Sequence, residues 1–116
     1  MRSFSIKNKT SDRLGLGTVQ WGKVYGLTNS TGIAKAIDIK KILHDADGSG
    51  RIIDTAIAYE KAETILGRQK VCCMNFRLVT KTRPLESSLG SNNEIVKNFR
   101  NDFYKSLKKI GIKKVY

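Results

Sequence analysis

The chain has 116 residues, of which 40% are hydrophobic and 28% are charged, a composition typical of one globular domain with a modest core. No run approaches the roughly 18 consecutive apolar residues of a membrane span, and residues 1–10 are polar and basic with no apolar signal region behind them, so we expect a cytoplasmic protein. Subtracting 10 acidic from 22 basic residues leaves a net charge of +12, which attracts polyanions without selecting among them.

The first elements are a strand and a helix. Residues 13–21 (RLGLGTVQW) form an apolar run whose glycines, Gly15 and Gly17, permit tight turns or close approach of a ligand, so we expect a short strand that ends in a functional loop. Apolar residues then recur at helical spacing and predict an amphipathic helix over 34–45, which residues 47–50 end.

The alternation continues to the end of the chain. The β-branched run 51–56 predicts a strand, and residues 59–69 predict a helix for which Gly67 is a suitable C-terminal cap. Further on we expect a strand over 76–80, a loop over 84–93, a helix over 94–110 and the start of another strand at 112–116. This alternation predicts an α/β fold with right-handed crossovers and a parallel sheet.

The two cysteines, Cys72 and Cys73, are adjacent, so they cannot supply the spaced pairs of a disulfide framework. A vicinal thiol pair can bind a soft metal or take part in redox chemistry, but no histidine or third cysteine lies nearby in the sequence. We therefore expect ordinary small residues near a strand start in a reducing compartment, and no metal site.

Three chemically active side chains follow the carboxyl ends of two predicted strands. Asp54 ends one strand, Tyr59 follows five residues later, and Lys81 closes the next strand. In parallel α/β folds these strand ends meet at one edge, where active sites lie. An ammonium beside a phenol stabilises the phenolate, so Tyr59 becomes a better proton donor, while Asp54 keeps Lys81 charged and oriented.

Each of these residues also has an ordinary structural explanation when taken singly. Tyr59 can be a packing aromatic, Lys81 a solvated charge at a strand end, and Asp54 a helix N-cap. Only their joint placement distinguishes a site from three unrelated residues.

The segments LGLGTVQWG, IIDTAIAYEKAETILGR and FRLVTK, in this order, resemble three landmarks of the aldo-keto reductases. The resemblance runs from about residue 13 to residue 116. It implies that Asp54, Tyr59 and Lys81 correspond to three of the four catalytic residues of that family. It also implies that the loop after the first strand lies against the nicotinamide of NADP(H) and lines the substrate pocket. The residues concerned are Gly17, Thr18 and Val19 for the cofactor, together with Asp54, and Gln20 and Trp21 for the pocket.

The resemblance implies a (β/α)8 TIM barrel of which the first three to four βα units are present, and NADPH-dependent reduction of an aldehyde or ketone. The polar insert 22–32 is similar to that of reductases linked to sugar metabolism. The fourth catalytic residue of the family is a histidine after the fourth strand, so we expect residues 1–116 to be a single incomplete domain that lacks the C-terminal half and is inactive alone. Glu60 stands where the family usually has glycine, and the only histidine, His44, is expected to have a surface or packing role. An open sheet edge would favour self-association.

Two other classes of function compete with this interpretation. Residues 45–52 match part of a calcium loop, but the twelfth position is Ala56 where a bidentate glutamate is required. The basic run 105–114 is compatible with nucleic-acid binding, although no aromatic platform accompanies it, so a solvated helix face is the simpler explanation. We expect a small carbonyl substrate as partner, and neither a membrane nor a specific nucleic acid.

Overall fold

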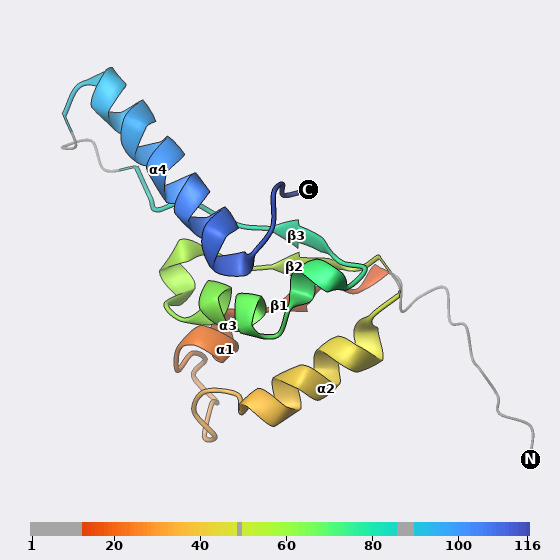
Figure 1. Cartoon of the computed structure of the whole chain (residues 1–116). Coiled ribbons are helices and arrows are strands. Elements are labelled where there is room, and N and C mark those ends of the chain that lie inside the picture. The colour runs from red at the N-terminus through yellow and green to blue at the C-terminus, as the bar shows by residue number, and fades with distance from the viewer. Residues whose placement is uncertain (1–12, 49, 86–89) are drawn as a thin grey trace, which may run out of the picture.

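The computed structural model describes residues 13–48, 50–85 and 90–116, so the expectations for residues 1–10 and for Ser49 lie outside the described residues. Within the described part the chain forms one three-stranded sheet of order β1-β2-β3, in which all strand pairs are parallel (Figure 1). The strands are β1 (Leu16–Gly17), β2 (Ile52–Asp54) and β3 (Arg77–Val79). The predicted α/β fold with a parallel sheet is confirmed.

The register of the strands aligns their carboxyl ends. Gly17 of β1 is opposite Asp54 of β2, which is in turn opposite Val79 of β3. Backbone hydrogen bonds continue beyond the strands, because the Thr55 amide donates to the Val79 carbonyl oxygen at 2.9 Å. The residues that follow β1, β2 and β3 therefore begin at the same edge of the sheet.

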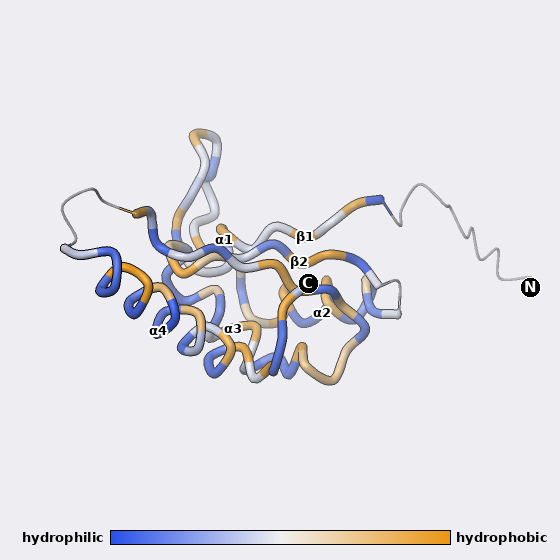
Figure 2. The backbone as a smooth tube through the Cα atoms, turned by 90° about the horizontal axis from the view of Figure 1, so that it is seen from above, coloured by the Kyte–Doolittle hydropathy of each residue, from blue (hydrophilic) through white to orange (hydrophobic). Residues whose placement is uncertain are grey.

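Three helices cover one face of the sheet and leave the other face open (Figures 1 and 2). They are α2 (Ala36–Ala46), α3 (Ala62–Arg68) and α4 (Asn92–Ile110). Helix α2 connects the parallel strands β1 and β2, and α3 connects β2 and β3. When all such connections have the same hand, the helices lie on the same side of the sheet. The predicted helices 34–45 and 94–110 are confirmed to within two residues at each end.

The sequence explains where α4 begins and ends. Ser91 and Glu94 form a reciprocal capping box, in which the Ser91 side chain accepts from the Glu94 amide and the Glu94 carboxylate accepts from the Ser91 amide. At the other end Gly111 has φ 79°, a left-handed conformation that glycine adopts without strain. The S-x-x-E signal thus places the helix start two residues before the predicted one.

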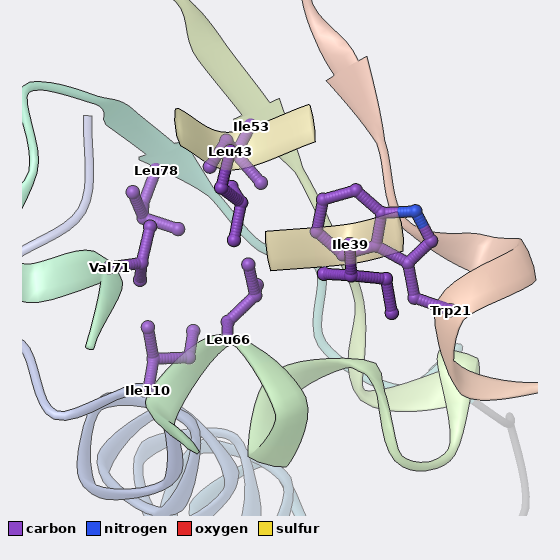
Figure 3. Close-up of a cluster of buried hydrophobic side chains, with 8 residues drawn as sticks. All are labelled: Trp21, Ile39, Leu43, Ile53, Leu66, Val71, Leu78 and Ile110. Atoms are coloured by element: carbon purple, nitrogen blue, oxygen red, sulfur yellow. The ribbon is translucent and has the colours of Figure 1, made fainter. Parts of the chain in front are cut away.

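The core lies between the sheet and the helices (Figure 3). Leu43 of α2 and Leu66 of α3 are completely buried, and each contributes roughly 1.5–3 kcal/mol by its removal from water. The cluster as a whole consists of Trp21, Ile39, Leu43, Ile53, Leu66, Val71, Leu78 and Ile110.

Two predicted strands are wrong in extent. The strand expected over 13–21 has only two residues, because the chain turns after it into the short helix α1 (Val19–Gly22), whose first turn is closed by a bond from the Trp21 amide to the Thr18 carbonyl oxygen. Residues 112–116 form no strand, although the Tyr116 amide donates to the Leu78 carbonyl oxygen of β3 at 2.8 Å. A single bond is too little to form a ladder.

The helix expected over 59–69 is divided. A 3-10 turn, η2 (Ile57–Tyr59), precedes α3. The predicted capping role of Gly67 is wrong, because Gly67 lies inside α3 and faces the backbone of Lys109 in α4, so closely that a Cβ atom would collide with the Lys109 carbonyl oxygen. Glycine is required at this position by packing and not by a cap.

His44 lies on the surface as predicted, with its side chain 87% exposed beside Asp45. Among the helices that the structure describes, none has the length and apolar character needed to cross a bilayer.

Candidate active site

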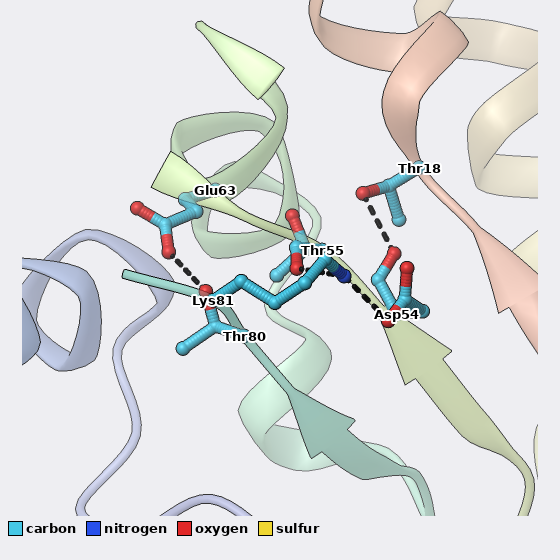
Figure 4. A network of polar contacts seen from close by, with 6 residues as sticks. All are labelled: Thr18, Asp54, Thr55, Glu63, Thr80 and Lys81. Atoms are coloured by element: carbon cyan, nitrogen blue, oxygen red, sulfur yellow. Dashed lines mark hydrogen bonds and ion pairs between the residues drawn. The ribbon is translucent and has the colours of Figure 1, made fainter. Parts of the chain in front are cut away.

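The three predicted site residues converge at the carboxyl edge of the sheet. Asp54 is the last residue of β2, Lys81 follows β3 by two residues, and Tyr59 ends η2. The Lys81 Nζ atom donates to Asp54 Oδ1 at 2.6 Å and to the Thr55 carbonyl oxygen at 3.0 Å (Figure 4). The same Nζ atom lies 5.2 Å from the centre of the Tyr59 ring. The carboxylate, the amine and the phenol ring therefore form one group.

The electrostatics of this group keep Lys81 charged. Partial burial acts to lower the pKa of Lys81, but the hydrogen bond and the negative charge of Asp54, with a smaller contribution from Tyr59, outweigh burial and raise the pKa above its ordinary value of 10.5. The side chains of Lys81 and Asp54 are 46% and 47% exposed, so solvent screens the pair and it adds little to stability. The main effect of the pair is to hold the Lys81 ammonium group in a fixed position next to the Tyr59 ring.

Backbone contacts set the position of Tyr59. Its amide donates to the Ala56 carbonyl oxygen at 3.1 Å, which closes the η2 turn. Gly22 of α1 packs directly on this turn, so that a Cβ atom on Gly22 would collide with the Tyr59 carbonyl oxygen. Sequence reasoning assigned no role to Gly22, because the contact depends on the backbone of Tyr59, which lies far along the chain.

Thr18 supports the site from behind. The amide and the hydroxyl of Thr18 both donate to the Asp54 carbonyl oxygen at 3.1 Å, and Thr18 is fully buried. These two hydrogen bonds hold the backbone of Asp54 at the end of β2 in place, and with it the Asp54 side chain. The predicted direct contact of Thr18 with a cofactor stays a prediction.

The other residues of the first loop divide into accessible and buried ones. Gly17 is exposed with open space where a Cβ atom would be, Val19 is half-buried, and Gln20 is exposed with its amide 3.3 Å from the Tyr25 carbonyl oxygen. Trp21 is 5% exposed and packs in the core (Figure 3), and its predicted place at the mouth of the pocket stays a prediction. The indole is buried because α1 turns this side chain beneath the sheet.

Sequence reasoning missed a second polar contact beside Lys81. The Thr80 hydroxyl donates to Glu63 Oε1 at 2.7 Å, and Glu63 is 1% exposed although it carries a carboxylate (Figure 4). The Nζ atom of Lys109 lies 4.0 Å from the other carboxylate oxygen. This contact joins α3 to the end of β3 and so holds the residue next to Lys81. The sequence around Glu63 contains nothing that would have predicted the burial of this acidic side chain.

Asp47 and Gly48, which belong to the segment considered as a calcium loop, form a turn after α2. Asp47 is the C-cap of α2, and its Oδ1 atom accepts from the amides of Gly48 and Asn75, both at 2.8 Å. The carboxylate thereby joins the end of α2 to the segment before β3.

Solved structures match this fold, whereas neither known family models nor the sequences of curated proteins match the chain. A crystal structure described as a "putative aldo-keto reductase" of Pseudomonas aeruginosa is 24% identical with a TM-score of 0.64, and the match covers 87% of this chain and 39% of that one. A second structure with the same description from this organism is 26% identical with a TM-score of 0.63, over 87% of this chain and 38% of that one.

The chain therefore spans about two fifths of the length of the structures that it matches. Its parallel strands and the helices on one face of the sheet are the arrangement expected for part of such a barrel. In structure, the chain is similar to part of an aldo-keto reductase barrel.

Proposed function

We propose that this chain contributes the Asp54–Tyr59–Lys81 group to the active site of an NADP(H)-dependent reductase that converts an aldehyde or a ketone into an alcohol. The observation that carries the proposal is the 2.6 Å contact between Lys81 Nζ and Asp54 Oδ1 beside the Tyr59 ring. Because residues 1–116 span about two fifths of the similar structures, activity is proposed for the barrel to which they contribute.

The residues around Gly17 fit one end of a nicotinamide cofactor. Gly17 is exposed and has no atom within 4 Å of an ideal Cβ position, so a flat ring can approach its backbone closely. Val19 and the Asp54 carboxylate lie on the same edge, whereas Thr18 acts through its hydrogen bonds to Asp54. When bound, the cofactor supplies the hydride for the carbonyl carbon.

In this proposal Tyr59 is the proton donor. The oxygen of a carbonyl group gains negative charge as the carbonyl is reduced, and a positioned acid lowers the barrier by supplying a proton to that oxygen. Lys81 stabilises the phenolate that Tyr59 leaves behind, and Asp54 holds the ammonium in place. Each role requires only a contact or a charge that the group already has.

A chimaeric barrel tests the proposal. Residues 13–116 replace the matching segment of one of the similar Pseudomonas proteins, and NADPH oxidation is followed with aldehydes, ketones and aldoses, the parent protein being the positive control. We expect the chimaera to reduce at least one carbonyl class and Tyr59→Phe to lower kcat by at least about 100-fold, as expected for loss of a general acid.

Two measurements separate loss of chemistry from loss of structure. Tyr59→Phe should keep the circular dichroism spectrum and NADPH affinity of the chimaera, because the change removes one hydroxyl group. Gly17→Ala should instead weaken NADPH binding, since its methyl group enters the open space beside the strand. A folded, active chimaera whose turnover is unchanged by Tyr59→Phe would refute the proposed role.

A further inference from the structure

The two cysteines lie side by side on the surface before β3. Cys72 and Cys73 are the last residues of the 3-10 turn η3 (Val71–Cys73), both are exposed, and their Sγ atoms are 3.8 Å apart. Successive side chains of an extended strand point to opposite faces. The turn brings these two thiols together instead.

The backbone holds this pair in place. The Cys73 amide donates to the Lys70 carbonyl oxygen at 2.9 Å, and the Met74 amide donates to the Val71 carbonyl oxygen at 3.0 Å. Val71 itself is 1% exposed and belongs to the core. The thiols are therefore presented by a turn that is anchored at its first residue and lies three residues before β3.

A pocket of about 300 Å³ is lined in part by Cys72. Most of its other lining side chains are rich in carbon, among them Met74, Phe76, Leu78 and Ile112, and two are cationic, Arg77 and Lys114. A ligand bound to the thiols thus has room for an aromatic substituent next to Cys72.

The small number of side chains that can coordinate a ligand near the two thiols limits the kinds of ligand that this site can hold. The chain contains two cysteines and one histidine, and the described residues include no group of three His, Cys, Asp or Glu side chains placed to hold a metal ion. A zinc ion would find only two of the four protein ligands that a structural site supplies. A trivalent organoarsenical, by contrast, is soft and binds two sulfurs while it keeps its carbon substituent.

We propose that Cys72 and Cys73 form a two-thiol site for an aryl-substituted trivalent arsenical whose ring occupies the adjoining pocket. In the reaction two As–S bonds form and the two As–OH bonds of the hydrated arsenical break. The two thiol protons leave with the hydroxyl groups as two molecules of water. Arsenic stays trivalent, so neither an oxidant nor a reductant is needed.

The test uses the reduced full chain, phenylarsine oxide and intact-mass spectrometry. The wild-type chain should bind one phenylarsenic group and keep it against an excess of a monothiol such as 2-mercaptoethanol. Cys72→Ser and Cys73→Ser, each with one thiol, should lose the group at a monothiol concentration at least about 100-fold lower, since the second sulfur then no longer acts at high effective concentration. A dithiol should remove the group from all three proteins.

Three outcomes would overturn the proposal: two phenylarsenic groups on one chain, none on the reduced wild type, or equal release from the wild type and the serine variants. Methylarsine oxide should be held more weakly than the phenyl compound, and equal retention would exclude the pocket from the site. Both cysteines are exposed, so the serine variants should keep the wild-type circular dichroism spectrum. The turn precedes β3 whereas Lys81 follows it, so this result is independent of the proposed reductase activity.

Discussion

At the scale of single residues, the backbone beside Tyr59 is strained. Glu60 has φ 51° and ψ −102°, a combination that residues with a Cβ atom rarely adopt and that costs of order 1–3 kcal/mol. Glycine adopts such angles freely. This gives a physical reason for the glycine that the resemblance to aldo-keto reductases leads us to expect at this position. The strain lies directly after the proposed proton donor, where the chain must turn from η2 into α3.

Glu60→Gly should therefore stabilise the protein by about 1 kcal/mol, the part of the strain that remains after the greater freedom of glycine in the unfolded chain is subtracted. Urea unfolding followed by circular dichroism measures the change. The matched control is Glu60→Ala, which keeps the Cβ atom and should give no such gain. Equal stability of the glycine and alanine variants would contradict the assigned strain.

At the scale of elements, α3 and α4 approach each other through a glycine. Gly67 of α3 faces the carbonyl oxygen of Lys109 near the end of α4, and Ile110 next to it is fully buried. This contact places α4 over α3 and thereby brings Lys109 near the buried carboxylate of Glu63. The position of α3 matters for the site, since Glu63 also binds Thr80 beside Lys81.

Gly67→Ala should destabilise the protein by about 1–3 kcal/mol, because the added methyl group collides with backbone that cannot move aside without separating the helices. Gly17→Ala is the matched control: it adds the same methyl group where no atom lies within 4 Å, so the free energy of unfolding should stay the same or rise by up to about 1 kcal/mol, because alanine has less freedom than glycine in the unfolded chain. Urea denaturation of both variants makes the comparison. A Gly67→Ala protein as stable as Gly17→Ala would disprove the close approach of the helices.

At the scale of the whole molecule, charge repulsion opposes folding. The net charge is +12, whereas the ion pairs that can offset it among the described residues are few and partly exposed, such as Lys81–Asp54 with both side chains about half exposed. Exposed pairs contribute about 0–1 kcal/mol each. Long-range repulsion among the excess cations should therefore dominate the response to salt.

Sodium chloride should raise the Tm as its concentration goes from about 0.01 M to about 0.15 M, because the screening length falls from roughly 30 Å to roughly 8 Å over this range. Differential scanning calorimetry at fixed pH provides the measurement. Repeating the series with another monovalent sodium salt distinguishes screening, which both salts share, from binding of a particular anion. A Tm that falls over this range would mean that local ion pairs outweigh the repulsion.

The sequence by itself determined the order of the elements and the edge at which the site lies. Helical spacing of apolar residues and β-branched runs are local properties, so α2, α4 and the centres of β2 and β3 could be predicted from them. The meeting of Asp54 and Lys81 also followed from the sequence, because parallel strands align their carboxyl ends whatever else packs around them.

Only the tertiary structure decided which atoms come into contact across elements. It placed Trp21 in the core, gave Thr18 the role of a tie to Asp54, and made Gly67 a contact between helices. These roles depend on segments far apart in the chain that approach within a few ångströms. No pattern within one segment contains that information, because a buried polar or small residue is explained only by the partner that packs against it.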